Sequence, residues 1–331
     1  DRHYSRMRGA LAIADPAREG GALPLDGFFA AHPALEFFER EFKADRALAI
    51  HAVASPYRDR SHFDAQNVLE LGLGRAYASE EGWLNRIIDR MPRRGDEALA
   101  LGGSVPLILR GRHQVGSWSS AAMVGSDDDA LARIGALYEK DPILGPAFAK
   151  AVEVDDMAGN IRGGGRFGGL VEAMLRFFSH PDGPRVMVAE LGGWDTHANQ
   201  GRDKGRFAAR LRELDQGIAN LSAGLGDAWA DTVVLCVTEF GRTVRTNGTG
   251  GTDHGTASAV LGYGGALGGG RIIADWPGLA EGRLFQGRDL MPTTDLRAVY
   301  RAVAIQHLGL SAADADSALP ETSSLSLPRL A

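Results

Sequence analysis

DTVVLCVTEFGRTVRTNGTGGTDHG, residues 231–255, is the segment from which the fold is inferred. Its apolar run Val233–Val237 predicts a buried strand, because an unbroken run of apolar, largely β-branched residues is typical of strands covered on both faces. Glu239 and Arg242 follow the end of this strand, and a loop rich in Gly, Asn and Thr then leads to Asp253-His254. The segment therefore predicts chemically active side chains at a strand end.

A second apolar strand is expected about forty residues earlier, in the sequence RVMVAELGG, and it ends in Trp194-Asp195-Thr196-His197. This spacing fits one strand–helix–strand unit. Two strands of one sheet would direct their carboxylates and imidazoles to the same edge, which is where open α/β folds bind ligands. The two segments together predict a metal-dependent active site at that edge.

Strand and helix patterns alternate along the rest of the chain. A buried strand is expected over Ala47–Val53, a helix beginning at Ser61, and a C-terminal helix capped at Thr294. This alternation predicts a mostly parallel sheet with helices on both faces. The 331 residues, of which 44% are hydrophobic, allow a single domain over residues 1–331. Short extended runs within residues 95–125 suggest a small β excursion.

The composition excludes some classes of function. The net charge is -6 and the charges are interspersed, so we expect no nucleic-acid partner. No apolar segment reaches the ~18 residues of a membrane helix. The single cysteine, Cys236, excludes an internal disulfide and is expected to be a core residue. Nothing in the sequence indicates an oligomeric state.

The candidate metal ligands each have a structural explanation as well. An Asp-x-His pair such as Asp195 and His197 can bind one divalent ion, but it can also form a turn with a hydrogen-bonded Asp. The same ambiguity holds for Asp253-His254. A glutamate at a buried strand end, Glu239, needs either an ion or Arg242 as its partner. Together these residues predict a divalent metal, zinc or manganese before calcium, because they offer oxygen and nitrogen ligands.

The sequence Ser61-His62-Phe63-Asp64 also has two explanations. It fits a capping box, with Ser61 as the N-cap and Asp64 at the third helical position. A hydroxyl at a helix N-terminus also lies in a field that favours an anion, such as a phosphoryl or sulfuryl group. A metal-free Ser61–His254 hydrolase is a further alternative, which needs an orienting acid and an oxyanion hole. The remaining histidines are interpreted as structural: His3, His32, His51, His113, His180 and His307.

Four motifs, GGWDTHANQ, TEFGRTVRTNGTGGTDHG, RSHFDAQN and TTDLRAVYRAV, carry a resemblance to a known family. In this order, between about Leu11 and Leu310, they resemble the bacterial family of unknown function numbered 1501. That family is grouped with the alkaline phosphatase and sulfatase superfamily. The resemblance implies an alkaline-phosphatase-like three-layer α/β sandwich. It also implies an exported, periplasmic protein, since members commonly carry a twin-arginine export signal.

The superfamily pattern implies roles for individual positions. Asp195, His197 and His254 correspond to the ligands of one metal. Glu239 stands where a strand-end aspartate of a second metal is expected, and Phe240 stands where a histidine would follow. Relatives also have an earlier strand and a Gly-Gly-x-Asp-Gly segment with a ligand aspartate. This chain begins after that point, so we expect the sheet to lack its first strand.

The resemblance also implies a reaction. Ser61 corresponds to the nucleophile, and Arg242 would hold the remaining oxygens of the anion. Two ions about 4 Å apart would activate the nucleophile and neutralise the transferring group. We therefore expect a metal-dependent hydrolase of phosphate or sulfate esters, with a small-molecule or glycan anionic ester as substrate. The alternative is an exported binding or assembly protein that keeps the fold without hydrolysis, and the Phe240 departure motivates it.

Overall fold

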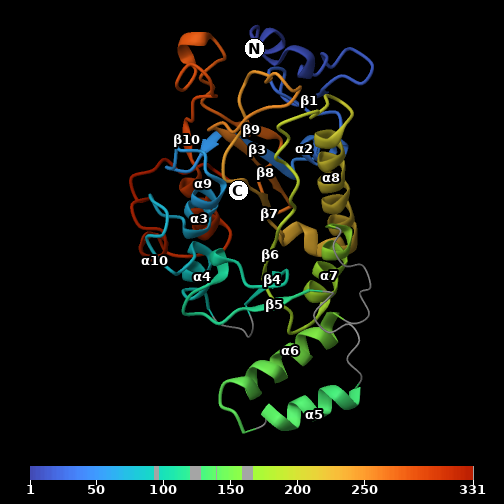
Figure 1. Cartoon of the computed structure of the whole chain (residues 1–331), viewed down its shortest axis with the longest axis vertical. Coiled ribbons are helices and arrows are strands. Elements are labelled where there is room, and N and C mark those ends of the chain that lie inside the picture. Colours follow the sequence, from blue (N-terminus) through green and yellow to red (C-terminus); the bar gives the residue numbers. More distant parts are fainter. Residues whose placement is uncertain (93–96, 120–127, 139, 159–166, 331) are drawn as a thin grey trace.

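The computed structural model describes residues 1–92, 97–119, 128–138, 140–158 and 167–330. The strands are β1 (Leu23–Pro24), β2 (Ala30–Ala31), β3 (Ala47–Ala54), β4 (Ala98–Leu101), β5 (Gly116–Trp118), β6 (Val186–Ala189), β7 (Val234–Cys236), β8 (Ser258–Tyr263), β9 (Arg271–Ile273) and β10 (Thr294–Asp295). The α-helices are α1 (Tyr4–Arg8), α2 (Glu36–Lys43), α3 (His62–Leu71), α4 (Trp83–Ile88), α5 (Asp128–Tyr138), α6 (Leu144–Ala158), α7 (Phe167–Ser179), α8 (Arg206–Leu225), α9 (Leu296–Gln306) and α10 (Ala312–Ala318). Short 3₁₀ helices span Gly9–Leu11, Leu107–Leu109, Gly226–Asp231 and Glu281–Arg283. Figure 1 shows the hairpin of α5 and α6 projecting from the rest of the molecule.

The main sheet is mixed, which differs from the expected mostly parallel sheet. Its strand order is β10-β3-β8-β7, and β9 also pairs with β3. Strand β3 is parallel to β9 and β10, whereas β8 is antiparallel to both of its neighbours. The physical reason is the connection between β7 and β8. A parallel pair needs a crossover, usually through a helix. Residues 237–257, all of them described, contain no helix, and the chain returns antiparallel.

The two strands that precede the motifs lie in different sheets. Strand β6 pairs with β4, and β4 pairs with β5, in a small parallel sheet, whereas β7 belongs to the main sheet. Strands β4 and β5 come from the region 95–125, of which residues 95–96 and 120–125 lie outside the described residues. Side chains of β6 and β7, including Val188 and Leu235, still pack against one common core. The prediction that both strands share a sheet is therefore wrong, but the strands lie against the same core.

Helices cover both faces of β3, as Figure 1 shows, with α3 and α9 on one side and α2 and α8 on the other. Leu48 and Ile50 of β3 pack into a core with residues of α4 and α9. Ala47 and Ala49 point to the opposite face and pack with residues of α2 and α8. The alternation follows from the two-residue period of a strand. It explains why the residues of β3 are apolar on both faces, apart from His51.

The C-terminal helix α9 begins one residue later than the sequence predicts. Thr294 pairs with Val53 in the β10–β3 ladder, so it cannot serve as the N-cap. Asp295 takes this position, and its carboxylate accepts a hydrogen bond from the backbone N–H of Arg297 at 2.9 Å. Over the described part of the chain, no helix combines the length and apolar character that crossing a bilayer requires.

A candidate metal centre

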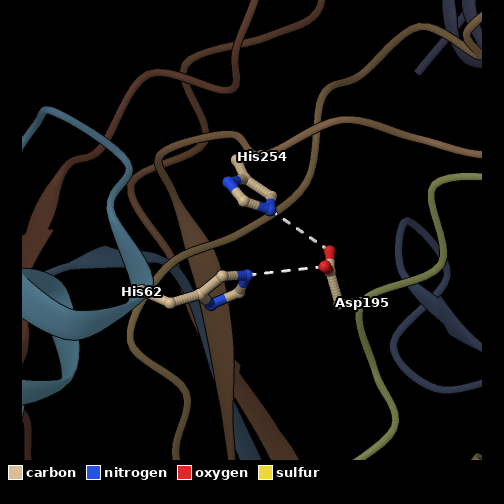
Figure 2. A group of neighbouring side chains, drawn as sticks. All are labelled: His62, Asp195 and His254. Atoms are coloured by element: carbon tan, nitrogen blue, oxygen red, sulfur yellow. Dashed lines mark hydrogen bonds and ion pairs between the residues drawn. The ribbon is translucent and has the colours of Figure 1, made fainter.

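Three segments distant in the sequence meet at the candidate site. His62 is the first residue of α3, the helix that follows β3 in the chain; Asp195 follows β6; and His254 lies in the loop between β7 and β8. One donor atom from each residue lies within 4.8 Å of the other two. Figure 2 shows both imidazoles directed at the carboxylate of Asp195. This arrangement is a possible metal-binding triad.

His197 adds a fourth side chain to this group. Its Nε2 lies 3.0 Å from Oδ1 of Asp195 and 3.0 Å from Nε2 of His254. His254 Nε2 lies 3.2 Å from Oδ1 of Asp195, and His62 Nε2 lies 3.6 Å from its Oδ2. Neighbouring ligand atoms of a tetrahedral zinc ion are separated by about 3.3 Å, given the metal–ligand distances of about 2 Å. The contacts of His197 and His254 with Asp195 are close to that separation, and His62, Asp195 and His254 form the group whose donor atoms all lie within 4.8 Å of one another.

The opposite nitrogen of each imidazole has a hydrogen-bond partner of its own. The pairs are His62 Nδ1 with Oε1 of Glu239 at 2.7 Å, His254 Nδ1 with the carbonyl oxygen of Arg60 at 3.0 Å, and His197 Nδ1 with Oδ1 of Asp253 at 3.3 Å. An acceptor at Nδ1 favours the tautomer that carries its proton there. The lone pairs on Nε2 then face Asp195. Lone pairs and a carboxylate at these distances repel one another unless a cation or a proton lies among them.

Asp195 is held in its ionised form by its surroundings. Burial alone raises the pKa of Asp195, but the hydrogen bond and the charge of Arg242 hold that pKa below its ordinary value. Arg242 donates from Nη1 to Oδ1 of Asp195, and its Nε donates to Oγ1 of Thr252 at 3.2 Å. An ionised carboxylate is the form that binds a metal. Arg242, expected to hold a substrate anion, therefore contacts the centre through Asp195.

Glycine residues allow the loop between β7 and β8 to pack closely against the other segments. A Cβ on Gly251 would lie 2.3 Å from the carbonyl oxygen of His197, and one on Gly255 would lie 2.5 Å from the carbonyl carbon of Arg242. Both distances are shorter than any side chain permits. Asn247 stabilises the same loop, because its side-chain amide donates hydrogen bonds to the carbonyl oxygen of His197 at 2.8 Å and to Oδ1 of Asp253 at 3.0 Å. The glycines of the TGGTDHG sequence thus bring its histidine to the centre.

The hydrogen bond from Asn247, together with His197, lowers the pKa of Asp253 despite slight burial. Asp253 contacts His197 at Nδ1, and Glu239 contacts His62 at Nδ1. The predicted ligands Asp195, His197 and His254 are brought directly together, whereas Glu239 and Asp253 lie behind imidazoles. Each of the two carboxylates thus contacts an imidazole of the group through Nδ1.

Ser61 occupies the N-cap position of α3, but the expected capping box does not form. Its side chain makes no capping hydrogen bond to the first turn of α3, all of which is described. The carboxylate of Asp64 instead accepts hydrogen bonds from the hydroxyls of Tyr57 at 3.1 Å and Tyr77 at 2.9 Å. Ser61 directly precedes His62, so the predicted nucleophile is adjacent in sequence to a residue of the triad.

His62 was not predicted as a ligand, since the helix-start pattern explained its segment. The available signal was its position after a buried strand, the same position that identified the other motifs. Phe240 packs on two imidazoles of the centre, with ring centroids 4.8 Å from His62 and 4.9 Å from His254. Its ring therefore forms an apolar wall beside these two imidazoles.

Comparison with known proteins identifies the family. A family model described as "Protein of unknown function (DUF1501)" matches residues 46–318. The chain therefore belongs to this family, as its motifs predicted, and the match includes every residue of the centre. Neither the curated proteins nor the solved structures contain a match to the chain. Its grouping with alkaline phosphatases and sulfatases stays a prediction.

Proposed function

We propose that this protein is a divalent-metal-dependent hydrolase of phosphate or sulfate esters that uses Ser61 as its nucleophile. The observation that carries the proposal is the convergence of three imidazole Nε2 atoms on the Asp195 carboxylate, with Nδ1 of each ring held by another group. Histidines oriented in this way through their second nitrogen are characteristic of metal ligands.

Zinc or manganese is the ion we expect at the centre. Three nitrogen donors and one carboxylate match the ligands that zinc prefers, and manganese accepts the same mixture. Calcium is disfavoured because it takes oxygen ligands almost exclusively. When bound, such an ion neutralises charge on the transferring group and activates a nearby oxygen.

The proposed substrate is an anionic ester because the site offers several groups that favour negative charge. Ser61 lies at the N-terminus of the ten-residue helix α3, where free N–H groups and the helix dipole attract anions. Arg242 adds a guanidinium beside Asp195. In the proposed reaction the Ser61 hydroxyl loses its proton and its oxygen bonds to phosphorus or sulfur while the bond from that atom to the ester oxygen breaks, and the alcohol leaves with the ester oxygen and a proton. Water then releases phosphate or sulfate and restores the serine.

Turnover of aryl phosphates and aryl sulfates by the metal-loaded protein tests this proposal. We expect Ser61→Ala to reduce kcat by at least about 10³-fold, as loss of a nucleophile does. It should leave metal content unchanged, because the hydroxyl is not among the converging donors. Ser117→Ala, an exposed position on β5, is the matched control and should retain native turnover. Unchanged turnover in Ser61→Ala would remove Ser61 from the mechanism.

A non-catalytic binding or assembly protein is the second candidate. Two observations favour it: the Phe240 ring packs on His62 and His254, and Arg242 is paired with Asp195. This candidate predicts a metal-loaded protein that turns over no ester in the panel. Turnover that is lost in a Glu239 variant would exclude it.

We further propose that the protein is exported to the periplasm. The support is its family resemblance, since members commonly carry a twin-arginine signal. Fractionation of cells that express the natural gene tests this location, and recovery only with cytoplasmic markers would contradict it.

A further inference from the structure

A fully buried carboxylate, Asp289, lies beside the metal centre and contacts none of the converging donors. It has no exposed surface and lies in a tight turn closed by a bridge to Phe285. Arg60 donates to its Oδ2 from Nε at 2.9 Å, Thr256 donates to the same oxygen at 2.8 Å, and Arg288 donates to Oδ1 at 2.8 Å. A buried ion network of this kind is costly unless each group is satisfied.

The partners of Asp289 flank two histidines of the centre. Arg60 precedes His62 by two residues, and Thr256 follows His254 by two residues. Arg288 also donates from Nη2 to the carbonyl oxygen of His254. The carbonyl of Arg60 is the group that accepts the hydrogen bond from His254 Nδ1. Asp289 therefore ties together the two chain segments that supply these imidazoles.

The backbone of Arg60 is held in an unusual conformation. Its φ is 62°, in the left-handed region, which a residue with a side chain rarely adopts. The guanidinium is fixed at the same time by Asp289 and by Oε1 of Gln286, which lies 2.7 Å from Nη2. Strained backbone of this kind persists only where its surroundings hold it. Here the strained residue presents its carbonyl to His254.

We infer that Asp289 is a positioning residue that fixes the tautomer and direction of His254 and holds the segment of His62 against it. Removal of its charge takes away the carboxylate that both guanidinium groups share, so the Arg60 carbonyl is held less firmly. His254 then loses the acceptor that keeps its proton on Nδ1. The functional value of this positioning rests on the proposed metal centre. The effect on the His254 tautomer is expected in the metal-free protein as well.

The test compares Asp289→Asn with Glu41→Gln in the full chain. Glu41 is a matched control away from the centre, because it is 3% exposed and accepts two hydrogen bonds of 2.8 Å from Arg46. Ring ¹⁵N shifts of labelled histidines report the tautomer in the metal-free protein, and competition with a chromophoric chelator reports zinc affinity. We expect the Nδ1–H tautomer of His254 in the native protein and mixed tautomers in Asp289→Asn. Zinc affinity should fall about tenfold in that variant, as for other groups that orient ligands. Glu41→Gln should keep both.

Native tautomer and native zinc affinity in Asp289→Asn would overturn the inference. Loss of both properties in Glu41→Gln would also overturn it, because the effect would then be general destabilisation. If Asp289→Asn does not fold, Arg60→Gly serves in its place, since glycine adopts the left-handed conformation freely but lacks the guanidinium. It should show mixed tautomers as well, and the native tautomer would count against the inference. A native protein without zinc affinity would refute the metal centre, while the ¹⁵N result would still decide the role of Asp289.

Discussion

Glu239 tests whether the centre is built from oriented imidazoles or from directly bound carboxylates. Its Oε1 lies 2.7 Å from Nδ1 of His62, and its Oε2 accepts a hydrogen bond from the Thr238 hydroxyl at 2.9 Å. Hydrogen bonds to charged groups contribute about 1.5–3 kcal/mol. The His62 side chain is 39% exposed, so we take the lower end of that range because of solvent screening. Since 1.4 kcal/mol is a factor of ten, Glu239→Ala should weaken zinc binding about tenfold.

Glu239→Gln separates the two possible roles. A glutamine oxygen still accepts a hydrogen bond from His62 Nδ1, so an orienting role predicts a loss of only about threefold, or about half the free energy of the charged bond. A direct ligand role predicts that both variants lose affinity equally, because a neutral amide is a much weaker ligand. Zinc affinity is measured by competition with a chromophoric chelator. Glu153→Ala, in which an exposed ion pair on α6 is lost, is the control. Native affinity in Glu239→Ala, or equal losses in both variants, would refute the orienting role.

Three further predictions concern stability. Burial lowers the pKa of His51 to about 4, so below pH 6.5 the unfolded chain binds a proton that the folded chain does not. The free energy of unfolding should therefore fall by about 3 kcal/mol between pH 6.5 and 4. Urea titrations should show that His51→Phe removes this part of the pH dependence, and an unchanged slope would contradict the assignment. The Tyr300 hydroxyl is buried and has no hydrogen-bond partner within the described residues, so Tyr300→Phe should keep the ring stacked on Trp83 and raise the free energy of unfolding by up to about 1 kcal/mol. A loss above that size in urea unfolding would mean that the hydroxyl is satisfied. Free zinc at 100 times its Kd should stabilise the native protein against urea by about 2.7 kcal/mol, and no shift on addition of chelator would count against the site.

The elements that the sequence predicted well are those with purely local signals. The apolar runs of β3, β6 and β7 are recognisable in the sequence, and the residues of β3 are almost all buried, whereas those of β6 and β7 are partly buried. Strand pairing is not local, and the sequence pattern does not distinguish a crossover from a direct return. The antiparallel direction of β8 and the separation of β6 from β7 into two sheets therefore became visible only in the structure.

The candidate site was predicted in part for a related reason. Asp195, His197 and His254 follow apolar strands within glycine-rich loops, and this context marks them as unusual. His62 lies in a segment whose sequence is also typical of a helix N-terminus. The sequence pattern alone therefore did not identify His62 as a metal ligand. Asp289 has no recognisable sequence pattern, since two of its partners, Arg60 and Thr256, lie far from it along the chain. Contacts of this kind depend on the assembled fold.

Metal content tests the central claim most directly. The native protein, purified without chelators, is analysed by elemental mass spectrometry beside a His62→Ala, His254→Ala double variant. His180→Ala, which removes an exposed imidazole outside the centre, is the control. The account predicts about one divalent ion per chain in the native protein and in the control, and loss of that ion in the double variant. Equal metal content in all three proteins, or a native protein that holds no metal after incubation with zinc and manganese, would contradict it.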